Sequence, residues 1–402
     1  MRLLKLIVEG VPLFKDDRLD IDLFAQDRVP RQDDGMLVAD VTRVGRAKSV
    51  FSQNIVGISG VNATGKTTTL RLIRLVLDLL AGEVLTREFR GENLLLGKVG
   101  KKLGVKAVFW HADAFYLIES RLSFPDDSTL FLPGRLFYED ETIWMLAVGR
   151  VNRRMISDIQ TFKRNAVIIR RRNGTADDPL ALSEEQLMLL GDSRSIVSVI
   201  TGRVRTNATS IHRELLAQTM PAPVVQAFDP SVEILDWNQE NEVYTLKFRG
   251  EPARVVDRNV AGILLSRGTI YGTELVNKAV DVLGTGSYLL IDEIEEAINR
   301  SLVATVIDLF ASPVTNPNGA QLIFTTHYPE LLDVPHRKDN VYLLVRDLDN
   351  RTEVIKYSDR VSRIENKKSE VVMSDLIKGS MPRYPDVRAM RNYVRGRVNG
   401  QD

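Results

Sequence analysis

One short segment has the residue types and spacing of a phosphate-binding loop. Residues 57–70 read GISGVNATGKTTTL, and the spacing from Gly60 to Gly65-Lys66-Thr67 fits G-x-x-x-x-G-K-[ST]. Glycines let the backbone curl so that successive N–H groups converge on an anion at a helix N-terminus. Lys66 is expected to reach the β- and γ-phosphates of ATP, and the Thr67 hydroxyl to bind Mg²⁺. A plain glycine-rich turn is the alternative. The predicted nucleotide-binding residues are Gly60, Asn62, Ala63, Thr64, Gly65, Lys66, Thr67 and Thr68.

Two carboxylates and a histidine follow apolar runs later in the chain. The run in SYLLIDEIEEAI ends at Asp292 and Glu293, and nucleotides bind at the carboxyl ends of strands in open α/β sheets. Beside a phosphate-binding loop, Asp292 is expected to support Mg²⁺ and Glu293 to take a proton from attacking water. The run in QLIFTTH ends at His327, whose imidazole is expected to contact the γ-phosphate. Each feature alone is also compatible with ordinary packing or surface structure.

A fourth segment, LLSRGTIYG, places the small residues Ser266 and Gly268 at the start of a predicted helix. The N-terminus of a helix carries a partial positive charge and free N–H groups, which favour an anion. Serine is also a preferred capping residue, so an ordinary helix cap explains this segment when it is taken alone. In combination with the other motifs, we predict that Ser266 and Gly268 contact nucleotide.

The glycine-rich segment lies between a predicted strand and a predicted helix. QNIVGIS (53–59) is apolar and rich in β-branched residues, which is typical of a buried strand. The following KTTTLRLIRLVLDLLAG has apolar residues at helical spacing and stops at Gly82. Strand, loop and helix in this order are the context that the phosphate-binding interpretation requires.

The remaining pattern predicts an α/β protein with a mixed sheet, an antiparallel β-subdomain and a helical insertion. LLKLIVEG and RLDIDLF are expected strands, and residues 25–50 are expected to be loop-rich. Runs within 103–147, among them STLFLP, predict antiparallel strands, and 150–235 is expected to be mostly helical. A hairpin at VEILDWN and VYTLKFRG, a helix over 272–282, and strands at SYLLID, QLIFTTH and NVYLLVRD follow.

Composition indicates a soluble globular protein. The chain has 402 residues, a net charge of +1 and no cysteine, which excludes disulfides, thiol catalysis and thiolate metal sites. Apolar runs such as LIRLVLDLLAG are interrupted by charge well short of a membrane span of ~18 residues. The first residues resemble a strand more than a signal peptide, because charged residues interrupt them. We therefore expect a cytoplasmic protein without membrane contact.

Together and in this order, the four motifs resemble those of ATP-binding-cassette (ABC) ATPases. GVNATGKTTTL resembles the family's Walker A motif, LLSRGT its signature loop, LLIDEIEEAINRSL its Walker B motif and D-loop, and IFTTHYPELL its switch-histidine strand. The closest variety is the soluble, SMC-related and armless branch that includes the overcoming-lysogenization-defect (OLD) and abortive-infection ATPases. The resemblance covers roughly 1–85 and 225–385.

This resemblance implies a P-loop NTPase fold and a dimerising ATPase. Two copies would sandwich two ATP·Mg²⁺, with Lys66 of one subunit and Ser266 and Gly268 of the other meeting each γ-phosphate. We interpret residues 1–402 as one such domain. Its parts are 1–85 with the N-terminal strands and Walker A, 86–225 with the β-subdomain and insertion, 226–350 with the signature, Walker B and switch histidine, and 351–402 with a C-terminal strand and basic tail.

Several positions depart from the family pattern. Arg267 occupies a usually small signature position, Asn299-Arg300 replaces the common His-Pro of the D-loop, and neither Gln160 nor Gln186 is a convincing Q-loop residue. The residues after His327 are too few for the Toprim nuclease domain of OLD proteins. We therefore expect a switch subunit of an anti-phage defence system whose effector, a nuclease or toxin, is a separate polypeptide.

Two basic segments leave further partners open. One spans 150–172 and the other is the tail MPRYPDVRAMRNYVRGR. Each is compatible with a solvated helix face, an acidic protein partner or a nucleic-acid backbone. Two alternative functions remain open beside the switch subunit: a DNA-repair ATPase that clamps DNA, and an ATP-bound scaffold with little turnover.

Overall fold

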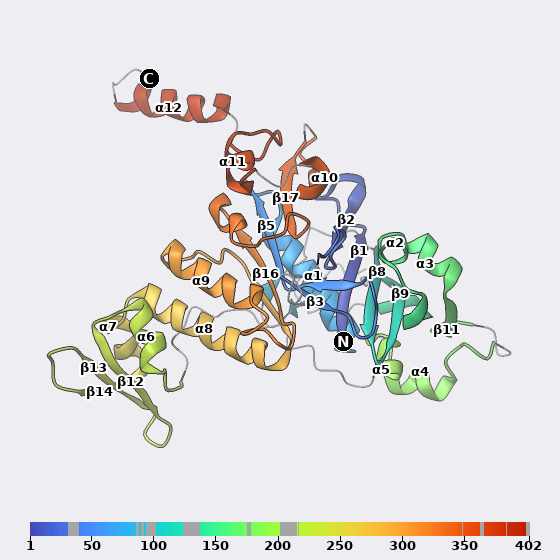
Figure 1. Cartoon of the computed structure of the whole chain (residues 1–402), viewed down its shortest axis with the longest axis horizontal. Helices are drawn as coiled ribbons and strands as arrows, with labels where there is room; N and C mark the ends of the chain where they lie inside the picture. Colours follow the sequence, from blue (N-terminus) through green and yellow to red (C-terminus); the bar gives the residue numbers. More distant parts are fainter. Residues whose placement is uncertain are drawn as a thin grey trace.

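A mixed five-stranded sheet forms the centre of the molecule in the computed structural model (Figure 1). The structure describes residues 1–30, 40–85, 88–89, 92–93, 102–123, 137–174, 178–201, 215, 217–347, 349–361, 366–382 and 384–398. The strand order is β15-β16-β5-β17-β18, with β18 antiparallel and the others parallel. The bounds are β5 (Ile55–Gly60), β15 (Tyr288–Ile291), β16 (Gln321–Thr326), β17 (Val341–Arg346) and β18 (Thr352–Lys356). The strands predicted at 53–59, SYLLID, QLIFTTH and NVYLLVRD are confirmed.

A second, antiparallel sheet has the order β11-β10-β9-β8-β1-β2. Its strands are β1 (Arg2–Glu9), β2 (Arg18–Asp22), β8 (Lys102–His111), β9 (Ala114–Ser123), β10 (Phe137–Ala147) and β11 (Val167–Arg171). The antiparallel strands predicted within 103–147 are confirmed, except that STLFLP lies outside the described residues. The first two strands of the chain complete this sheet, because β1 pairs with β8 as well as with β2.

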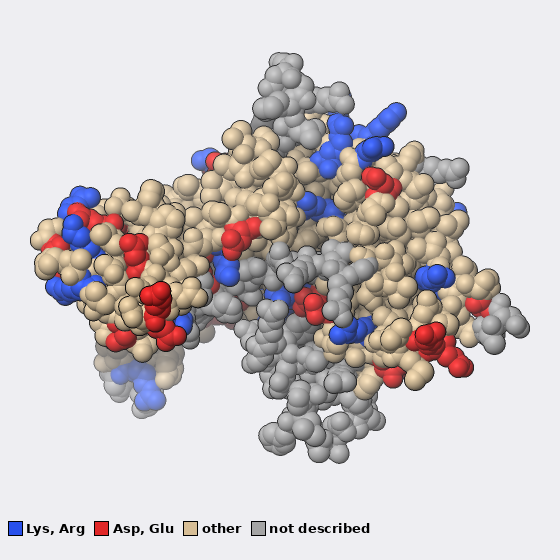
Figure 2. Space-filling view, turned by 90° about the horizontal axis from the view of Figure 1, so that it is seen from below, with Lys and Arg blue, Asp and Glu red and all other residues tan. Residues whose placement is uncertain are grey.

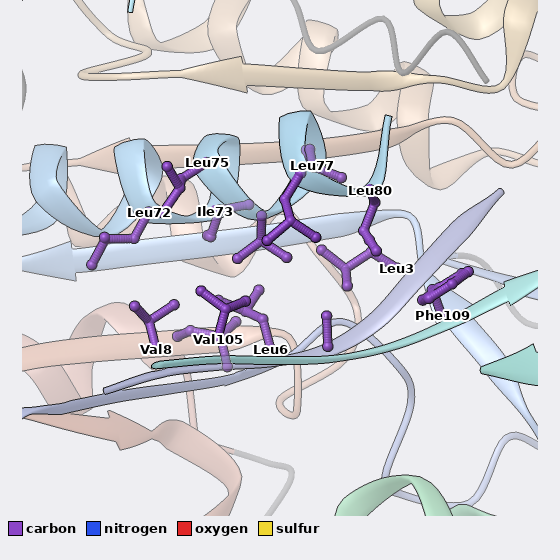
Figure 3. Packing of buried hydrophobic residues seen from close by; sticks show 14 of the residues in the cluster. Leu3, Leu6, Val8, Leu72, Ile73, Leu75, Leu77, Leu80, Val105 and Phe109 are labelled. Carbon is purple, nitrogen blue, oxygen red and sulfur yellow. The ribbon is translucent and has the colours of Figure 1, made fainter. Parts of the chain in front are cut away.

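Helix α1 (Lys66–Leu80) is buried between the two sheets, as its apolar residues on more than one face require. Figure 3 shows Leu72, Ile73 and Leu80 of α1 on the side of the helix that faces Leu3, Leu6 and Val8 of β1 and Val105 of β8. The same cluster includes Val56 and Ile58 of β5. The residue that begins α1 is Lys66, so the packing of this helix fixes the position of the loop before it.

Helices α8 (Arg267–Thr285) and α9 (Arg300–Ala311) contribute to a second core cluster, shared with β5, β15 and β16. The structure confirms the helix start predicted at Ser266 and Gly268, because α8 begins at Arg267 with the Ser266 side chain as its cap, whereas the bounds 272–282 predicted for this helix were too short. Glycine at 272 has a packing role, since a Cβ there would lie 2.3 Å from the Phe228 ring. A glycine inside this helix therefore marks a close contact and not an end.

The remaining elements are peripheral. Strands β12 (Val232–Asn238), β13 (Val243–Phe248) and β14 (Arg254–Asp257) form a three-stranded sheet, which confirms the predicted hairpin and adds a strand. The described residues of 150–235 are less helical than predicted, because β11 joins the antiparallel sheet and the helices there are short. Among the described residues, no helix has both the length and the apolar character needed to cross a membrane. The other elements are η1 (Lys15–Asp17), β3 (Val41–Arg43), β4 (Phe51–Gln53), β6 (Glu88–Phe89), β7 (Glu92–Asn93), η2 (Val148–Arg150), α2 (Arg153–Ser157), α3 (Ile159–Asn165), α4 (Glu184–Leu190), α5 (Val197–Thr201), α6 (Ala222–Phe228), α7 (Arg258–Leu264), η3 (Pro329–Asp333), α10 (Tyr357–Arg360), α11 (Lys368–Met373) and α12 (Tyr384–Val398).

Part of the first basic segment is neutralised within the chain. The Arg172 side chain is 3% exposed and pairs at 2.9 Å with Glu141, which is fully buried. Lys163 pairs with Glu119 at 2.6 Å, and Arg171 with Asp178 at 3.3 Å. These contacts pair three of the basic side chains, whereas Arg154 and Arg164 are exposed. The segment therefore offers less to a phosphate backbone than its sequence indicated.

Replacing Arg172 by methionine is expected to destabilise the protein by about 3–5 kcal/mol, because a buried carboxylate loses its countercharge. Burial already raises the pKa of Glu141, and Arg172 opposes that shift. Without Arg172 the folded-state pKa of Glu141 rises further, so stability is lost as pH rises through that pKa. Denaturant unfolding should show that the loss of unfolding free energy, relative to wild type, becomes smaller toward acid pH. Adding Glu141→Gln to the Arg172→Met chain should recover part of this loss. An equal loss of unfolding free energy at all pH values would contradict this explanation.

Candidate functional site

The loop between β5 and α1 is a backbone cradle that depends on its glycines. Gly65 has φ +93°, which favours glycine, and a Cβ there would lie 2.6 Å from Leu13 Cδ2. A Cβ at Gly60 would lie 2.4 Å from the carbonyl oxygen of Leu344 in β17. Ala63 also has a positive φ, of 63°. The chain therefore turns tightly enough to aim backbone N–H groups of the first turn of α1 at one point.

Hydrogen bonds within the loop and from β17 hold its shape. Lys66 Nζ donates to the Gly60 carbonyl oxygen at 2.8 Å and to that of Val61 at 3.3 Å. Thr64 Oγ1 donates to the Val61 carbonyl at 2.8 Å, and Arg346 Nη2 to the Ala63 carbonyl at 2.6 Å. Thr64 and Thr68 are buried, and Asn62 is exposed. The Lys66 ammonium thus lies folded over the concave side of the loop.

Burial lowers the pKa of Lys66, and the nearby carboxylates of Glu293, Asp292 and Glu295 oppose that shift. The lysine and the strand-end carboxylates therefore belong to one electrostatic group, although more than 220 positions separate them in the sequence.

The strongest link between distant motifs is a chain of hydrogen bonds through Asp292. Thr67 Oγ1 donates to Asp292 Oδ2 at 2.6 Å. Thr325 Oγ1, from the neighbouring strand β16, donates to Asp292 Oδ1 at 2.6 Å and accepts from the Glu293 backbone N–H at 2.8 Å. Parallel pairing of β15 with β16 brings Thr325 beside these carboxylates. One threonine therefore orients the Asp292 carboxylate and holds the backbone of Glu293.

His327 lies on the same side of the sheet edge as Glu293. Its Nε2 is 3.4 Å from Glu293 Oε1, and its backbone N–H donates to Glu295 Oε1 at 2.6 Å. Glu293 has φ 52°, an uncommon backbone conformation for a non-glycine residue. That conformation follows directly after the end of β15 and leaves the Glu293 side chain exposed.

Oxygen atoms of Thr67 and Asp292 suit a Mg²⁺ ion. Among the described residues, no group of three or more His, Asp or Glu side chains is arranged to hold a metal by itself. Mg²⁺ commonly binds through one or two protein oxygens together with substrate phosphates and water, so a hydroxyl and a carboxylate 2.6 Å apart fit this mode.

Ser266 and Gly268 lie at the start of α8, and their contacts are not with the loop at 60–67. Ser266 Oγ accepts from the Thr269 backbone N–H at 3.0 Å, so the serine is an N-cap. A Cβ at Gly268 would lie 2.7 Å from the carbonyl oxygen of Ala297. Within the described part of the chain, neither residue has a hydrogen bond to the loop at 60–67. The structure therefore joins Lys66, Thr67, Asp292, Glu293 and His327, and leaves Ser266 and Gly268 outside that group.

Sequence reasoning missed three supporting residues: Thr325, Glu295 and Arg346. Thr325 stands two positions before His327 in a segment already identified, so its place at the end of a strand could have suggested it. Arg346 at the end of β17 had no distinguishing pattern. Gln186 is engaged in a capping box with Ser183 at the start of α4, which gives it a structural role.

Comparison with known proteins finds a distant similarity to a solved structure. No protein-family model and no curated protein matches the chain. Among solved structures, the chain is similar to the SMC head domain from Thermotoga maritima, with a TM-score of 0.37 and 12% identity, over 89% of this chain and 99% of that one. This similarity is too distant to assign a family or a function.

Proposed function

We propose that this chain is an ATP-hydrolysing, dimerising switch of the ABC type. The observation that carries the proposal is the 2.6 Å hydrogen bond from Thr67 to Asp292, which joins a phosphate-binding loop to a strand-end carboxylate pair. Phosphate release from ATP in the presence of Mg²⁺ is the direct test. A chain that neither binds ATP nor releases phosphate would contradict the proposal.

In this proposal the loop holds the phosphates. Backbone N–H groups around Gly65 and the ammonium of Lys66 bind the β- and γ-phosphates. Thr67 and Asp292 hold Mg²⁺, which supplies charge neutralisation on the phosphate oxygens. Lys66 exchanges the carbonyl contacts that it makes with Gly60 and Val61 for contacts to phosphate.

The carboxylate of Glu293 accepts the proton of the attacking water, and His327 contacts the γ-phosphate. Glu293 is suited to this role because its side chain is exposed beside the loop while its backbone N–H is held by Thr325. The separation of 3.4 Å between His327 Nε2 and Glu293 Oε1 lets the imidazole orient the base. Both side chains reach the same end of the central sheet.

Ser266 and Gly268 are proposed to serve the site of a second copy. Ser266 caps α8 and Gly268 lies in its first turn, and within the described residues neither makes a hydrogen bond to the phosphate-binding loop of its own chain, so a nucleotide held by a second copy is the anion that we propose for this helix N-terminus. In a dimer where each copy places Ser266 and Gly268 against the nucleotide of the other, both sites would be completed. Formation of this closed dimer would then depend on bound nucleotide.

A narrower biological role follows from the sequence motifs. LLSRGT and LLIDEIEEAINRSL resemble the OLD and abortive-infection branch, which supports a cytoplasmic role in anti-phage defence with a separately encoded effector. Paired charges within 150–172 weaken the alternative in which this segment tracks DNA.

Replacing Thr325 by valine is expected to slow ATP hydrolysis about 10–100-fold, the usual effect of losing a group that orients a metal ligand. The two side chains have similar shape, so the change removes the hydrogen bonds to Asp292 and Glu293 and little else. Thr273→Val is the matched control, since the hydroxyl of this buried threonine donates to backbone carbonyls within α8. Equal steady-state rates for the two variants would contradict the positioning role.

Replacing Ser266 by aspartate separates the capping role from the anion contact. Aspartate is as good an N-cap as serine, so α8 should keep its stability. Its carboxylate should repel the γ-phosphate of the facing copy, and hydrolysis and ATP-dependent dimerisation should fall together. Ser183→Asp at the cap of α4 is the control and should change neither. ATP affinity of the monomer should survive, as measured by calorimetry at low protein concentration.

A further inference from the structure

Helix α12 presents an apolar stripe that nothing in the described chain covers. It has no buried residue, and Figure 1 shows it projecting beyond α11 away from the sheets. Val387, Met390, Val394 and Val398 recur at intervals of three or four, so they lie along one side of the helix. Met390 is 61% exposed and Val398 78% exposed. A helix with such a stripe gains stability by packing against another surface.

Positive charge runs beside this stripe. Arg388, Arg391 and Arg395 follow the same helical spacing on the adjacent side, and all three are exposed. The stripe and this arginine row form one basic, partly apolar face, which we call the α12 face. A matching surface must therefore combine exposed apolar side chains with negative charge.

The exposed side of α4 has that complementary character. Met188 and Leu189 are 85% and 81% exposed, and each lies one turn after an exposed glutamate, Glu184 and Glu185 respectively. Figure 2 shows acidic side chains grouped at the right-hand end of the molecule, the end that carries α4. We call these four residues the α4 face.

The α4 face is held in place by the residues on its inner side. Leu187 and Leu190 pack against the main core cluster, and the Ser183–Gln186 capping box fixes the start of the helix. Both glutamates and both apolar side chains are therefore directed outward by the packing of the same helix.

The two faces lie at opposite ends of the molecule (Figure 1), so one chain in this conformation does not bring them together. We propose that the α12 face of one copy docks on the α4 face of a second copy. The arginine row then meets Glu184 and Glu185 while the valine and methionine stripe covers Met188 and Leu189. The contact is distinct from the nucleotide-dependent closure proposed above and needs no nucleotide.

The side chains of the α12 face favour a second copy of the protein over a lipid surface or nucleic acid as the binding partner. A phosphate backbone would use the arginines but leave the aliphatic stripe in water. Helices that lie in a membrane surface insert Trp, Phe or Leu, whereas this stripe consists of valine and methionine. Side chains of this size suit packing against a protein surface. Because the two faces differ and lie at opposite ends of the chain, a contact that the second copy does not return is heterologous, and repetition of it produces rings or open filaments.

Sedimentation of the full-length, nucleotide-free protein tests this contact. Wild-type chain should associate as its concentration is raised, and salt should weaken the association. Val394→Asp on α12 and Leu189→Asp on α4 should each weaken it at least about tenfold, the effect of losing a central interface residue. Asn392→Asp, on the polar side of α12, is the matched control for added charge and should associate more strongly than Val394→Asp.

Mixing the two defective chains gives the sharpest result. The Val394→Asp chain keeps an intact α4 face, and the Leu189→Asp chain keeps an intact α12 face. Neither should associate alone, whereas an equal mixture should form a one-to-one dimer that grows no further. This recovery also shows that both variants are folded.

Three outcomes would overturn the proposal. One is a wild-type chain that stays monomeric without nucleotide. Another is association that both aspartate variants retain, and the third is a mixture that forms no dimer although each chain keeps its wild-type circular dichroism. Binding of anionic phosphatidylserine vesicles or duplex DNA by a monomeric wild-type chain, lost in Val394→Asp, would assign the α12 face to that surface instead.

Discussion

Substitution of Lys66 by alanine is expected to reduce ATP affinity at least about 30-fold, the effect of removing one partner of a close charge contact. The Lys66 ammonium lies over the loop, 2.8 Å from the Gly60 carbonyl oxygen, and no other lysine or arginine among the described residues donates to that carbonyl. Loss of the side chain leaves the phosphates facing Asp292 and Glu293 without the intervening positive charge. Titration calorimetry with ATP and Mg²⁺ measures the change directly.

Lys15→Ala is the control for this substitution. Lys15 is an exposed lysine two positions after Leu13, the residue that approaches Gly65, and its nearest carboxylate is Glu353 at 3.9 Å. Removal of the Lys15 side chain should leave the ATP affinity within about twofold of the wild-type value, because exposed and screened charges contribute little. If Lys66→Ala binds ATP as tightly as wild type, the loop at 60–67 is not the phosphate site.

Substitution of Glu293 by glutamine is expected to leave ATP binding intact and to slow hydrolysis by about 10²–10⁴-fold, the usual contribution of a general base. Glutamine has the same shape but accepts a proton poorly. Thr325 holds the backbone N–H of residue 293 and not its side chain, so the local backbone should be preserved. Single-turnover phosphate release separates the chemical step from nucleotide exchange.

Glu233→Gln on β12 makes the same chemical change far from the loop and should hydrolyse ATP at the wild-type rate. ATP-dependent dimers should also persist longer in Glu293→Gln than in wild type, because closure is no longer released by hydrolysis. Wild-type turnover in Glu293→Gln would place the base on another residue. Loss of ATP binding in this variant would show that Glu293 is part of the binding site itself.

The sequence predicted those parts of the structure that depend on residues close together in the chain. The loop at 60–67, helix α1 and the strands before Asp292 and His327 each depend on residues close together in sequence, such as apolar runs and glycines. Their patterns therefore predict structure without knowledge of the fold. The order of these motifs then allowed Lys66, Asp292 and Glu293 to be placed at one edge of a sheet.

Contacts that depend on strand pairing were not predictable in the same way. Thr325 contacts Asp292 because β16 lies beside β15 in one particular register, and nothing local to Thr325 reveals that partner. Arg172 illustrates the same limit, since its neighbours in sequence are basic while its actual partner, Glu141, lies 31 positions away. The range 272–282 predicted for α8 was too short for a different reason, because Gly272 accommodates the Phe228 ring inside a helix that continues through it.

The close approach of Gly268 to the carbonyl oxygen of Ala297 has a consequence for communication between two sites. In the proposed dimer, Gly268 serves the partner's nucleotide, whereas Ala297 follows four positions after the base of its own site. The space between these backbone segments is too small for even one added methyl group, so a large shift of one toward the other would displace it. We therefore expect each subunit to sense the state of both nucleotides, so that the two hydrolysis events are not independent. The same contact gives position 268 a mechanical reason to be glycine, since any side chain there would push the two segments apart.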